Sequence, residues 1–319
     1  MAATGSELPY DFLKKITNDF AEDRIISGSP FGTVYRGVMP DCGTQIAVMK
    51  LQEENARIPA DYKTFKKEVQ NVMVLKHENI VQLLGFCSET SKKLVLFEGM
   101  YTQTDITETL LCYEYLPVGS LEDNLFGAVD WDTRFKIIKG ICKGLHYLHK
   151  LDIPIIHMDL KPENILLDAN MVPKIANFAL SRVFGQEQTR LCTQTVVGSY
   201  AYMAREYIYR GEISARSDIY SLGLIIIEIT TREKNCPQQD QRSASNFIDK
   251  VSKEWTLEHI ASKYPLLGSD GLQTVKTCIA IGLKCVEVDQ KCRPAIDEIV
   301  DTLNGLRASR TENGVRKNR

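Results

Sequence analysis

The strongest constraint on the fold is that strand-like and helix-like segments are segregated along the chain and do not alternate. From Ile25 to about Glu114, short runs rich in β-branched and aromatic residues lie between Gly, Asp and Ser, as is typical of strands separated by turns. One amphipathic stretch, residues 61–76, interrupts them with apolar residues at helical spacing. After Pro117 helical periodicity dominates, at residues 131–150, 214–231, 273–286 and 294–306. This order predicts an α+β protein with two lobes, a small β-rich N-lobe with one helix and a larger α-helical C-lobe.

A short linker separates the two predicted lobes. The Pro and Gly of LPVGSL, residues 116–121, are typical of such a connection. We therefore expect an N-terminal extension at 1–22, an N-lobe at 23–116, a C-lobe at 117–306 and a disordered basic tail at 307–319.

Composition excludes several classes of function. The 319 residues carry a net charge of −2, which gives no electrostatic basis for binding nucleic acid or an anionic membrane. The nine cysteines are odd in number and form no C-x-x-C pair, so a reducing compartment fits best. No signal peptide is readable, and no apolar stretch approaches the roughly 18 residues of a transmembrane segment. We expect a cytoplasmic protein, with recruitment to the plasma membrane by a partner as an alternative.

Five ordered motifs resemble those of a protein kinase. They are GSPFGTVYRG at 28–37, IAVMKL at 46–51, HMDLKPEN at 157–164, NFA at 177–179 and CRP at 292–294. The surrounding strings PVGSLEDNLF, MDLKPENILLD and KCRPAIDEIV are most similar to plant receptor-like kinases, which typically phosphorylate Ser and Thr. The resemblance implies a bilobal kinase fold and an ATP site between motifs that this chain keeps only in part.

The glycine-rich loop that covers the ATP phosphates in such kinases is altered. Gly28 and Gly32 stand at two of its glycine positions, and Val34 stands where the family packs against adenine. Pro30 replaces the middle glycine, so the loop loses a backbone N–H and its φ is fixed near −65°. We expect a stiffer and poorer cover for phosphates.

The family's ATP lysine is replaced by methionine. The pattern is Ala-x-Lys, and strand alternation puts Met49 on the same face as Ala47 and turns Lys50 to the other face. Glu68 stands 19 residues after Met49, where the resemblance places the glutamate that pairs with the lysine, so Glu68 has lost its partner. The alternative is that a β-bulge rotates Lys50 back into the site.

The catalytic loop is better preserved. His157, Asp159, Lys161 and Asn164 stand at family positions. The resemblance gives Asp159 the role of catalytic base, Lys161 that of a contact to the transferred phosphoryl group and Asn164 that of a metal ligand. Met158 replaces the arginine that usually binds a phosphorylated activation loop, which places the sequence in the non-RD class.

The metal-binding motif D-F-G is degraded. Asn177 replaces its aspartate, 13 residues after Asn164, and Ala179 replaces its glycine. An amide oxygen remains available, but Mg²⁺ is held chiefly by carboxylates, so we expect a weak metal site formed by Asn164 and Asn177.

The adenine pocket has no such changes. The resemblance implies a hinge that runs from Glu114 to Leu116 and apolar walls from Val34, Ala47 and Leu166, with Tyr113 at the gatekeeper position. We expect weak, metal-independent ATP binding, and we expect Mg²⁺ to be dispensable.

Other motif residues are expected to be structural. Glu206 and Arg293 should form an ion pair, and Asp218 should anchor the C-lobe. His146 and His149 lie three residues apart on a predicted helix without a nearby Cys or carboxylate in sequence, so packing is favoured over a metal site.

Two functions remain open. The first is a pseudokinase, a kinase-shaped scaffold or modulator whose partners are other kinases or receptor complexes. The second is a Ser/Thr kinase of low activity that transfers the ATP γ-phosphoryl group with Asp159 as base. The segment Ser91–Glu108 is longer than a tight hairpin needs, and an extended hairpin is favoured over an insertion that supplies a partner surface.

Overall fold

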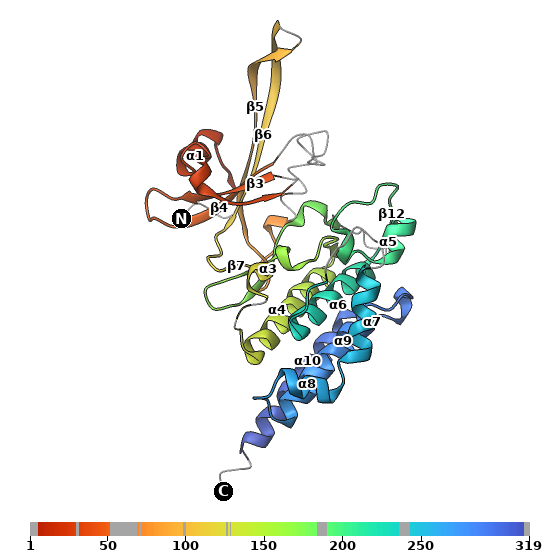
Figure 1. The fold of residues 1–319 in the computed structure, drawn as a ribbon. Coiled ribbons are helices and arrows are strands. Elements are labelled where there is room, and N and C mark those ends of the chain that lie inside the picture. Colours follow the sequence, from red (N-terminus) through yellow and green to blue (C-terminus); the bar gives the residue numbers. More distant parts are fainter. Residues whose placement is uncertain are drawn as a thin grey trace. The chain divides into compact units, whose positions relative to one another are not determined.

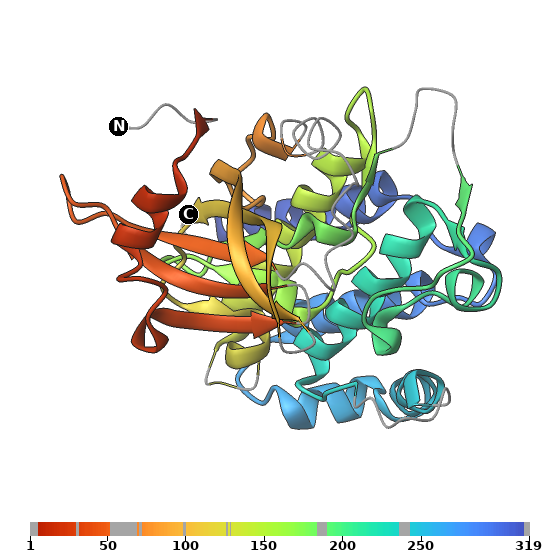
Figure 2. The same cartoon turned by 90° about the horizontal axis from the view of Figure 1, so that it is seen from above.

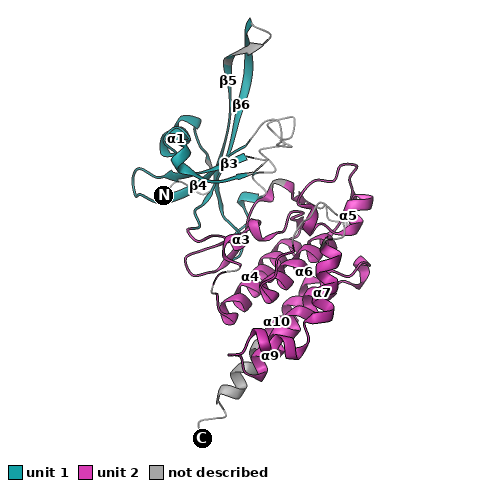
Figure 3. Ribbon diagram, viewed as in Figure 1, with its two compact units in different colours: residues 1–116 teal, residues 117–319 magenta. Residues whose placement is uncertain are grey.

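The computed structural model describes residues 6–29, 32–51, 69, 72–97, 100–125, 127, 129–183, 190–235 and 243–315. The chain divides into two compact units, 1–116 and 117–319 (Figure 3). The first is built around a β-sheet and the second mainly from helices, which confirms the predicted α+β fold class.

The first unit is a six-stranded sheet in the order β1-β5-β6-β4-β3-β2. Its strands are β1 (Ser6–Glu7), β2 (Ile25–Ser29), β3 (Gly32–Val38), β4 (Gln45–Leu51), β5 (Leu83–Phe97) and β6 (Met100–Glu114). The short helix α1 (Tyr10–Ile16) lies on one face (Figures 1 and 2). Leu13 and Ile16, one helical turn apart, are buried there against Ile46, Val48 and Leu110. The predicted N-terminal extension is therefore part of the sheet's own core.

The hairpin β5–β6 is much longer than the rest of the sheet. Its ladder runs from Leu83↔Tyr113 to Phe97↔Met100, whereas β4 pairs with β6 only as far as Lys50↔Leu110. The outer part extends away from the body of the unit (Figure 1). The strand-like runs at residues 80–87 and 92–97, which a polar segment separates in the sequence, thus belong to one continuous strand, and Ser91–Glu108 has the form of an extended hairpin.

The second unit is organised around α6 (Ala215–Thr231), which is almost entirely buried. It packs against α9 (Ser269–Cys285), and α10 (Ile296–Val315) packs against α4 (Trp131–His149) and α9. A side chain at Gly223 would place its Cβ 2.6 Å from Cys285 Cβ and 2.8 Å from Gly282 O, so glycine is required where α6 and α9 cross. The shorter helices are α3 (Leu121–Asn124), α5 (Arg205–Arg210), α7 (Ser243–Glu254) and α8 (Leu257–Lys263).

Short strands and 3-10 turns connect these helices. The strands are β7 (Gly119–Ser120), β8 (Ile155–Ile156), β9 (Ile165–Leu167), β10 (Pro173–Ile175), β11 (Arg182–Val183), β12 (Leu191–Cys192) and β13 (Glu212–Ile213). The 3-10 turns of the chain are η1 (Glu22–Arg24), η2 (Pro162–Asn164), η3 (Phe178–Leu180), η4 (Tyr200–Tyr202) and η5 (Gln290–Cys292).

One predicted segment differs from the structure, and another lies mostly outside the described residues. The helix α10 continues to Val315, whereas the sequence predicted a disordered tail from residue 307. The predicted helix at 61–76 lies mostly outside the described residues, although Val69 and Met73 are buried against Leu83 and Phe86. Within the described ranges, no helix combines the length and apolar character that crossing a membrane requires.

A buried carboxyl group fastens the end of α6 to the neighbouring η4 turn. Glu228 is fully buried and accepts hydrogen bonds from Tyr202 Oη at 3.0 and 3.1 Å and from the backbone N–H of Asn235 at 2.8 Å. Desolvation outweighs these hydrogen bonds and raises the pKa of Glu228 to about 8.

This shift predicts that the free energy of unfolding falls as pH rises from about 4.5 to about 8. In that window the unfolded chain releases a proton that folded Glu228 retains. The free energy of unfolding therefore falls by on the order of 2–4 kcal/mol across the window. Urea unfolding across the window should show this slope, and Glu228→Gln should remove most of it. The matched control is Glu233→Gln, because Glu233 is a half-buried carboxylate that pairs with Lys250. This variant should keep the slope. A Glu228→Gln protein with the unchanged slope would contradict the assignment.

Candidate functional site

The candidate site residues of the first unit lie on one face of β3 and β4. Val34 is paired with Met49, Arg36 with Ala47, and Ala47 with Tyr113. Because directly paired residues share a face, Val34, Ala47 and Met49 point to the same side of the sheet. Met49 is only 8% exposed, so its thioether is buried.

The two glycines of the loop motif differ in their surroundings. A Cβ on Gly32 would lie 2.4 Å from the carbonyl oxygen of Lys50, so the close approach of β3 to β4 requires glycine there. A Cβ on Gly28 would meet nothing within 4 Å. Pro30, predicted to stiffen the loop, lies outside the described residues, as does Glu68.

Lys50 lies on the opposite face of β4, under α1. Its Nζ is 2.8 Å from Glu108 Oε2 and 3.4 Å from Tyr10 Oη, and it lies 4.9 Å from the centre of the Phe20 ring. Desolvation acts to lower the pKa of Lys50, but the hydrogen bond and charge of Glu108 raise it more, so the pKa lies above its ordinary value. The backbone N–H of Tyr10 donates to Glu89, which strengthens the same attachment.

The register of β4 leaves Lys50 in this position. Pairing is continuous from Gly32↔Leu51 to Val38↔Gln45 on one side and from Ile46↔Glu114 to Lys50↔Leu110 on the other. The bulge that would rotate Lys50 toward the face of Ala47 is not found in either ladder.

Lys50 is therefore predicted to hold α1 on the sheet. Lys50→Met should remove the ion pair and the cation–π contacts and lower the free energy of unfolding by about 1 kcal/mol. Amide exchange in residues 10–16 should accelerate more than exchange in β3. Lys92→Met, an exposed lysine further along β5, is the matched control and should change neither. Unchanged exchange in α1 of the Lys50 variant would show that Lys50 is not its anchor.

The segment that the resemblance assigns to the hinge, Glu114–Leu116, is the last segment of the first unit. The backbone N–H of Glu114 donates to Gln82 O at 3.0 Å, and Glu114 Oε1 accepts from the N–H of Gln82 at 2.8 Å. Leu116 is buried, and Tyr113 packs with the cluster around Leu83 and Phe86. These contacts fix the end of β6 from both its backbone and its side chain.

In the second unit, Asp218 of α6 holds the loop that follows β8. Its carboxylate is 1% exposed and accepts the backbone N–H groups of His157 at 2.8 Å and Met158 at 2.9 Å. His149 Nε2 lies 2.9 Å from the same carboxylate. Met158 takes a left-handed φ of 69°, and its side chain is buried. Asp218 thus has the anchoring position that the sequence predicted.

Asp159, the predicted base, is enclosed by hydrogen-bond donors. Its Oδ1 accepts the backbone N–H of Ser199 at 3.2 Å, and its Oδ2 accepts Asn164 Nδ2 at 2.8 Å. The backbone N–H of Asp159 donates to His157 Nδ1 at 3.3 Å. Both carboxylate oxygens therefore have partners from within the unit.

Asn177 continues this chain of hydrogen bonds. Its Nδ2 donates to Asn164 Oδ1 at 3.2 Å, so the amide oxygen that would ligate a metal faces an N–H donor. Asn177 itself takes a left-handed conformation, with φ 66° and ψ 71°, that asparagine tolerates. Its Oδ1 is buried and has no hydrogen-bond partner among the described residues.

This donor set fits Mg²⁺ poorly. Asn164 and Asn177 contribute two neutral amides, one of them hydrogen-bonded to the other. Mg²⁺ prefers carboxylate and phosphate oxygens in a nearly ideal octahedron, and a donor N–H directed at one ligand oxygen opposes its binding.

The remaining predicted residues lie close by in the same unit. Lys161 precedes η2, which contains Asn164, and Leu166 lies in β9 between Ser120 of β7 and Lys174 of β10. Ala179 lies in η3, next to Phe178, whose ring packs edge-on against His157 at 5.1 Å. The second unit therefore brings the side chains of Asp159, Asn164 and Asn177 together, and Lys161 lies between Asp159 and Asn164 in the same loop.

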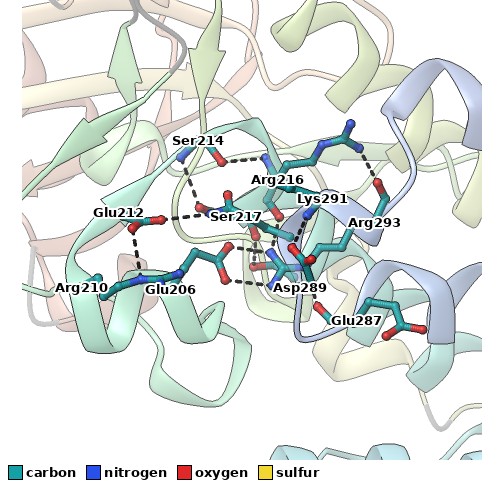
Figure 4. Close-up of polar contacts among 12 residues, drawn as sticks. Glu206, Arg210, Glu212, Ser214, Arg216, Ser217, Glu287, Asp289, Lys291 and Arg293 are labelled. Carbon is teal, nitrogen blue, oxygen red and sulfur yellow. Dashed lines mark hydrogen bonds and ion pairs between the residues drawn. The ribbon is translucent and has the colours of Figure 1, made fainter.

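A buried ion pair joins α5 to the turn before α10 (Figure 4). Glu206 of α5 binds Arg293 through two parallel hydrogen bonds of 2.6 and 2.8 Å, which confirms the predicted pair. The guanidinium also donates to the carbonyl oxygens of Glu287 and Arg216, while Arg216 Nη1 donates back to Arg293 O. Satisfied donors and acceptors on both sides make this a rigid clamp between α5, α6 and the turn before α10.

The two helical histidines serve separate carboxylates. His146 Nε2 lies 2.9 Å from Asp297, and His149 Nε2 lies 2.9 Å from Asp218. Within the described part of the chain, no three His, Cys, Asp or Glu side chains gather in a way that could hold a metal ion.

Sequence reasoning missed the partners that come from far along the chain. Ser199 reaches Asp159 through its backbone N–H, and Tyr10, Phe20 and Glu108 surround Lys50. A backbone donor carries no side-chain signature, and no pattern in the sequence relates Tyr10 to Lys50.

Comparison with known proteins gives a consistent result. Residues 21–303 match the family described as protein kinase domain. Cysteine-rich receptor-like protein kinase 10 of Arabidopsis thaliana is 38% identical over 309 residues, which cover 93% of this chain and 43% of that protein. Cysteine-rich receptor-like protein kinase 6 of Oryza sativa subsp. japonica is 36% identical over 295 residues, which cover 90% of this chain and 40% of that protein. The chain thus spans less than half the length of these relatives.

Proposed function

Because this chain belongs to the protein kinase family, with a kinase domain of the plant receptor-like type, we propose that it is a pseudokinase that acts as a scaffold or modulator in receptor signalling. Members of the family use ATP and Mg²⁺. The observation that carries the proposal is the hydrogen bond from Asn177 Nδ2 to Asn164 Oδ1, which joins the two expected metal ligands to each other. A neutral amide pair supplies none of the charge that phosphoryl transfer requires from this position.

The charges on β4 support the same proposal. Met49 offers no positive charge on the face that carries Ala47 and Val34, and Lys50 is engaged by Glu108 on the other face. An ammonium that clamps the α and β phosphates has no substitute in this strand. Loss of that charge together with the metal carboxylate removes two successive contacts to the same phosphates, and the combined cost in rate is many orders of magnitude.

In this function, phosphorylation of the activation loop does not control the protein through residue 158. The arginine position holds Met158, whose side chain is buried and uncharged. A phosphate on the activation segment would find no cation at residue 158, so the protein has the non-RD character and responds to partners by another route.

The proposed partners are inferred from the family to which the chain belongs, and not from a particular surface of the structure. Receptor-like kinases act on and with other proteins, so other kinases or receptor complexes are the partners that we propose. Nucleic acid is not among the proposed partners, because the net charge of −2 gives no electrostatic basis for binding it.

Nucleotide binding is a separate property. The family resemblance assigns Val34, Ala47 and Leu166 to the adenine walls and Glu114–Leu116 to the hinge, and all of these positions except Glu114 hold apolar or aromatic residues. We propose weak ATP binding through the adenine base, without a contribution from metal. Thermal unfolding should show a small increase in midpoint with ATP and the same increase with ATP plus MgCl₂. A shift that appears only with Mg²⁺ would contradict metal-independent binding, and Asn177→Asp should make the shift Mg²⁺-dependent.

The alternative function is a Ser/Thr kinase of low activity. It is favoured by one specific arrangement, the Asn164 side chain that positions Asp159 at 2.8 Å, with Lys161 two residues after the base. In that function Asp159 accepts the proton of the substrate hydroxyl, and the reaction rate is limited by weak metal and phosphate binding.

A reversion experiment separates the two functions. The unaltered protein, incubated with labelled ATP and Mg²⁺ or Mn²⁺, is expected to incorporate no more label than its Asp159→Ala variant. The double variant Met49→Lys with Asn177→Asp should gain label by at least roughly a hundredfold, because both missing charges return. Incorporation by the unaltered protein that Asp159→Ala abolishes would establish the low-activity kinase instead. The single variants Met49→Lys and Asn177→Asp report which charge limits the rate.

A further inference from the structure

A cation and a hydroxyl group meet between the first turns of α5 and α7. Arg205, the first residue of α5, donates a hydrogen bond from Nη2 to Ser245 Oγ at 2.6 Å. Ser245 is the third residue of α7, a helix of 12 residues. Arg205 is exposed and Ser245 is only half-buried, so another protein can reach this hydroxyl group.

The partner of this hydroxyl differs from those of other helical hydroxyls in the second unit. Several of them donate to a backbone carbonyl oxygen one turn earlier, as at Thr230, Thr274, Thr277 and Thr302. Ser245 instead accepts a hydrogen bond from a guanidinium group. A neutral hydroxyl offers arginine a single acceptor without charge, whereas a phosphate offers a charged acceptor that can bind the guanidinium in two places.

The charge of Arg205 has no carboxylate partner among the described residues. The adjacent Glu206 is committed to Arg293 through two hydrogen bonds. The kinase motif A-P-E has proline at the position of Arg205, so the motif itself does not supply this cation. The chain therefore places beside Ser245 a positive charge that the Glu206–Arg293 pair does not use.

We propose that Ser245 is a phosphorylation site and that Arg205 binds its phosphate. In the reaction, Ser245 Oγ attacks the γ-phosphoryl group of ATP bound to a serine/threonine kinase. The hydroxyl proton passes to the base of that kinase, and ADP leaves. The phosphate brings close to two negative charges and three acceptor oxygens to the position of a neutral hydroxyl. Arg205 then forms charge-assisted hydrogen bonds with it.

The charges around Ser245 favour the phosphate on balance. The first turn of α7 lies at the positive end of the helix dipole, which adds to the attraction of Arg205. Asp249, one turn further along α7, has the same sign of charge as the phosphate. Because Asp249 is exposed, water and salt screen this repulsion, whereas Arg205 is in direct contact with Ser245.

The sequence before the acceptor indicates the class of kinase that modifies it. Arg242 lies three residues before Ser245, in the string Arg-Ser-Ala-Ser. Kinases select substrates partly through patterns of charge, and a basic residue at this distance suits an enzyme with an acidic subsite. Arg242 lies outside the described residues and enters only by its place in the sequence. This inference does not depend on whether the protein itself transfers phosphate, because the modifying kinase is a separate protein.

The phosphate attaches α7 more firmly to its neighbours. The helix already packs against η4, and its Phe247 and Val251 are buried. The contact between Ser245 and Arg205 adds an attachment of the first turn of α7 to α5. Phosphorylation strengthens this second attachment, so we expect α7 to open less often.

The first experiment tests whether Ser245 accepts phosphate. The unaltered protein is incubated with ATP, Mg²⁺ and a serine/threonine kinase that selects arginine three residues before its acceptor, and is then digested with trypsin. Cleavage after Arg242 and Lys250 gives the peptide 243–250, whose fragment masses distinguish Ser245 from Ser243. We expect phosphate on Ser245. A peptide without phosphate, or with phosphate on Ser243 alone, would overturn the proposal.

The second experiment tests the role of Arg205. Amide exchange is measured in residues 247–254, with serine or with phosphoserine incorporated at position 245. The phosphate should slow exchange by roughly tenfold in the unaltered protein and by less than about threefold in Arg205→Gln. Without phosphate, Arg205→Gln should exchange within about threefold of the unaltered protein, because its side chain is exposed and its hydrogen bond to Ser245 is a single contact.

The matched control is Arg210→Gln, because Arg210 is an exposed arginine at the other end of α5 that pairs with Glu212. This variant should keep the tenfold effect of the phosphate. Equal slowing in Arg205→Gln and in the unaltered protein would show that Arg205 does not bind the phosphate. Exchange that the phosphate leaves unchanged in the unaltered protein would likewise refute the proposal.

Discussion

The buried carboxylate of Asp218 is the constraint on which the second unit depends. A charge that is 99% shielded from water is tolerated only with full compensation, and two backbone N–H groups and a histidine ring provide it. These contacts fix the backbone at His157 and Met158, and Asp159 follows directly. The loop thus obtains its shape from α6.

Shape and charge have become separate properties in this site. Asn177 has nearly the size of aspartate, and Met49 has nearly the length of lysine, so each fits the space without the charge. Met158 is shorter than arginine and is likewise uncharged. Both methionines are buried, where an apolar chain costs less than an unpaired cation. Relative to the family motifs, these residues therefore preserve packing without the charge. A chain altered in this way keeps its fold.

Local pattern and motif resemblance predicted the fold class, the helices around α4, α6 and α9, and the Glu206–Arg293 pair. They did not predict that β5 is continuous, because the polar run at 88–93 lacks the apolar alternation of a strand, and pairing with β6 holds it extended. Nor did they predict the N–H of Ser199 on Asp159 or the rings beside Lys50. Such contacts depend on tertiary placement, which local periodicity does not encode. The roles predicted for Pro30 and Glu68 fall outside the described residues and stay predictions.

The glycine at position 32 carries a lesson about reading motifs. Its hydrogen atoms face the carbonyl oxygen of Lys50, and any larger residue would push two neighbouring strands apart. The geometry of the sheet alone would therefore require glycine at position 32, even in a protein that binds no nucleotide. Of the two glycines that remain in the loop motif, Gly32 is thus explained by its close contact with the backbone of the adjacent strand. Its presence is therefore no evidence for phosphate binding.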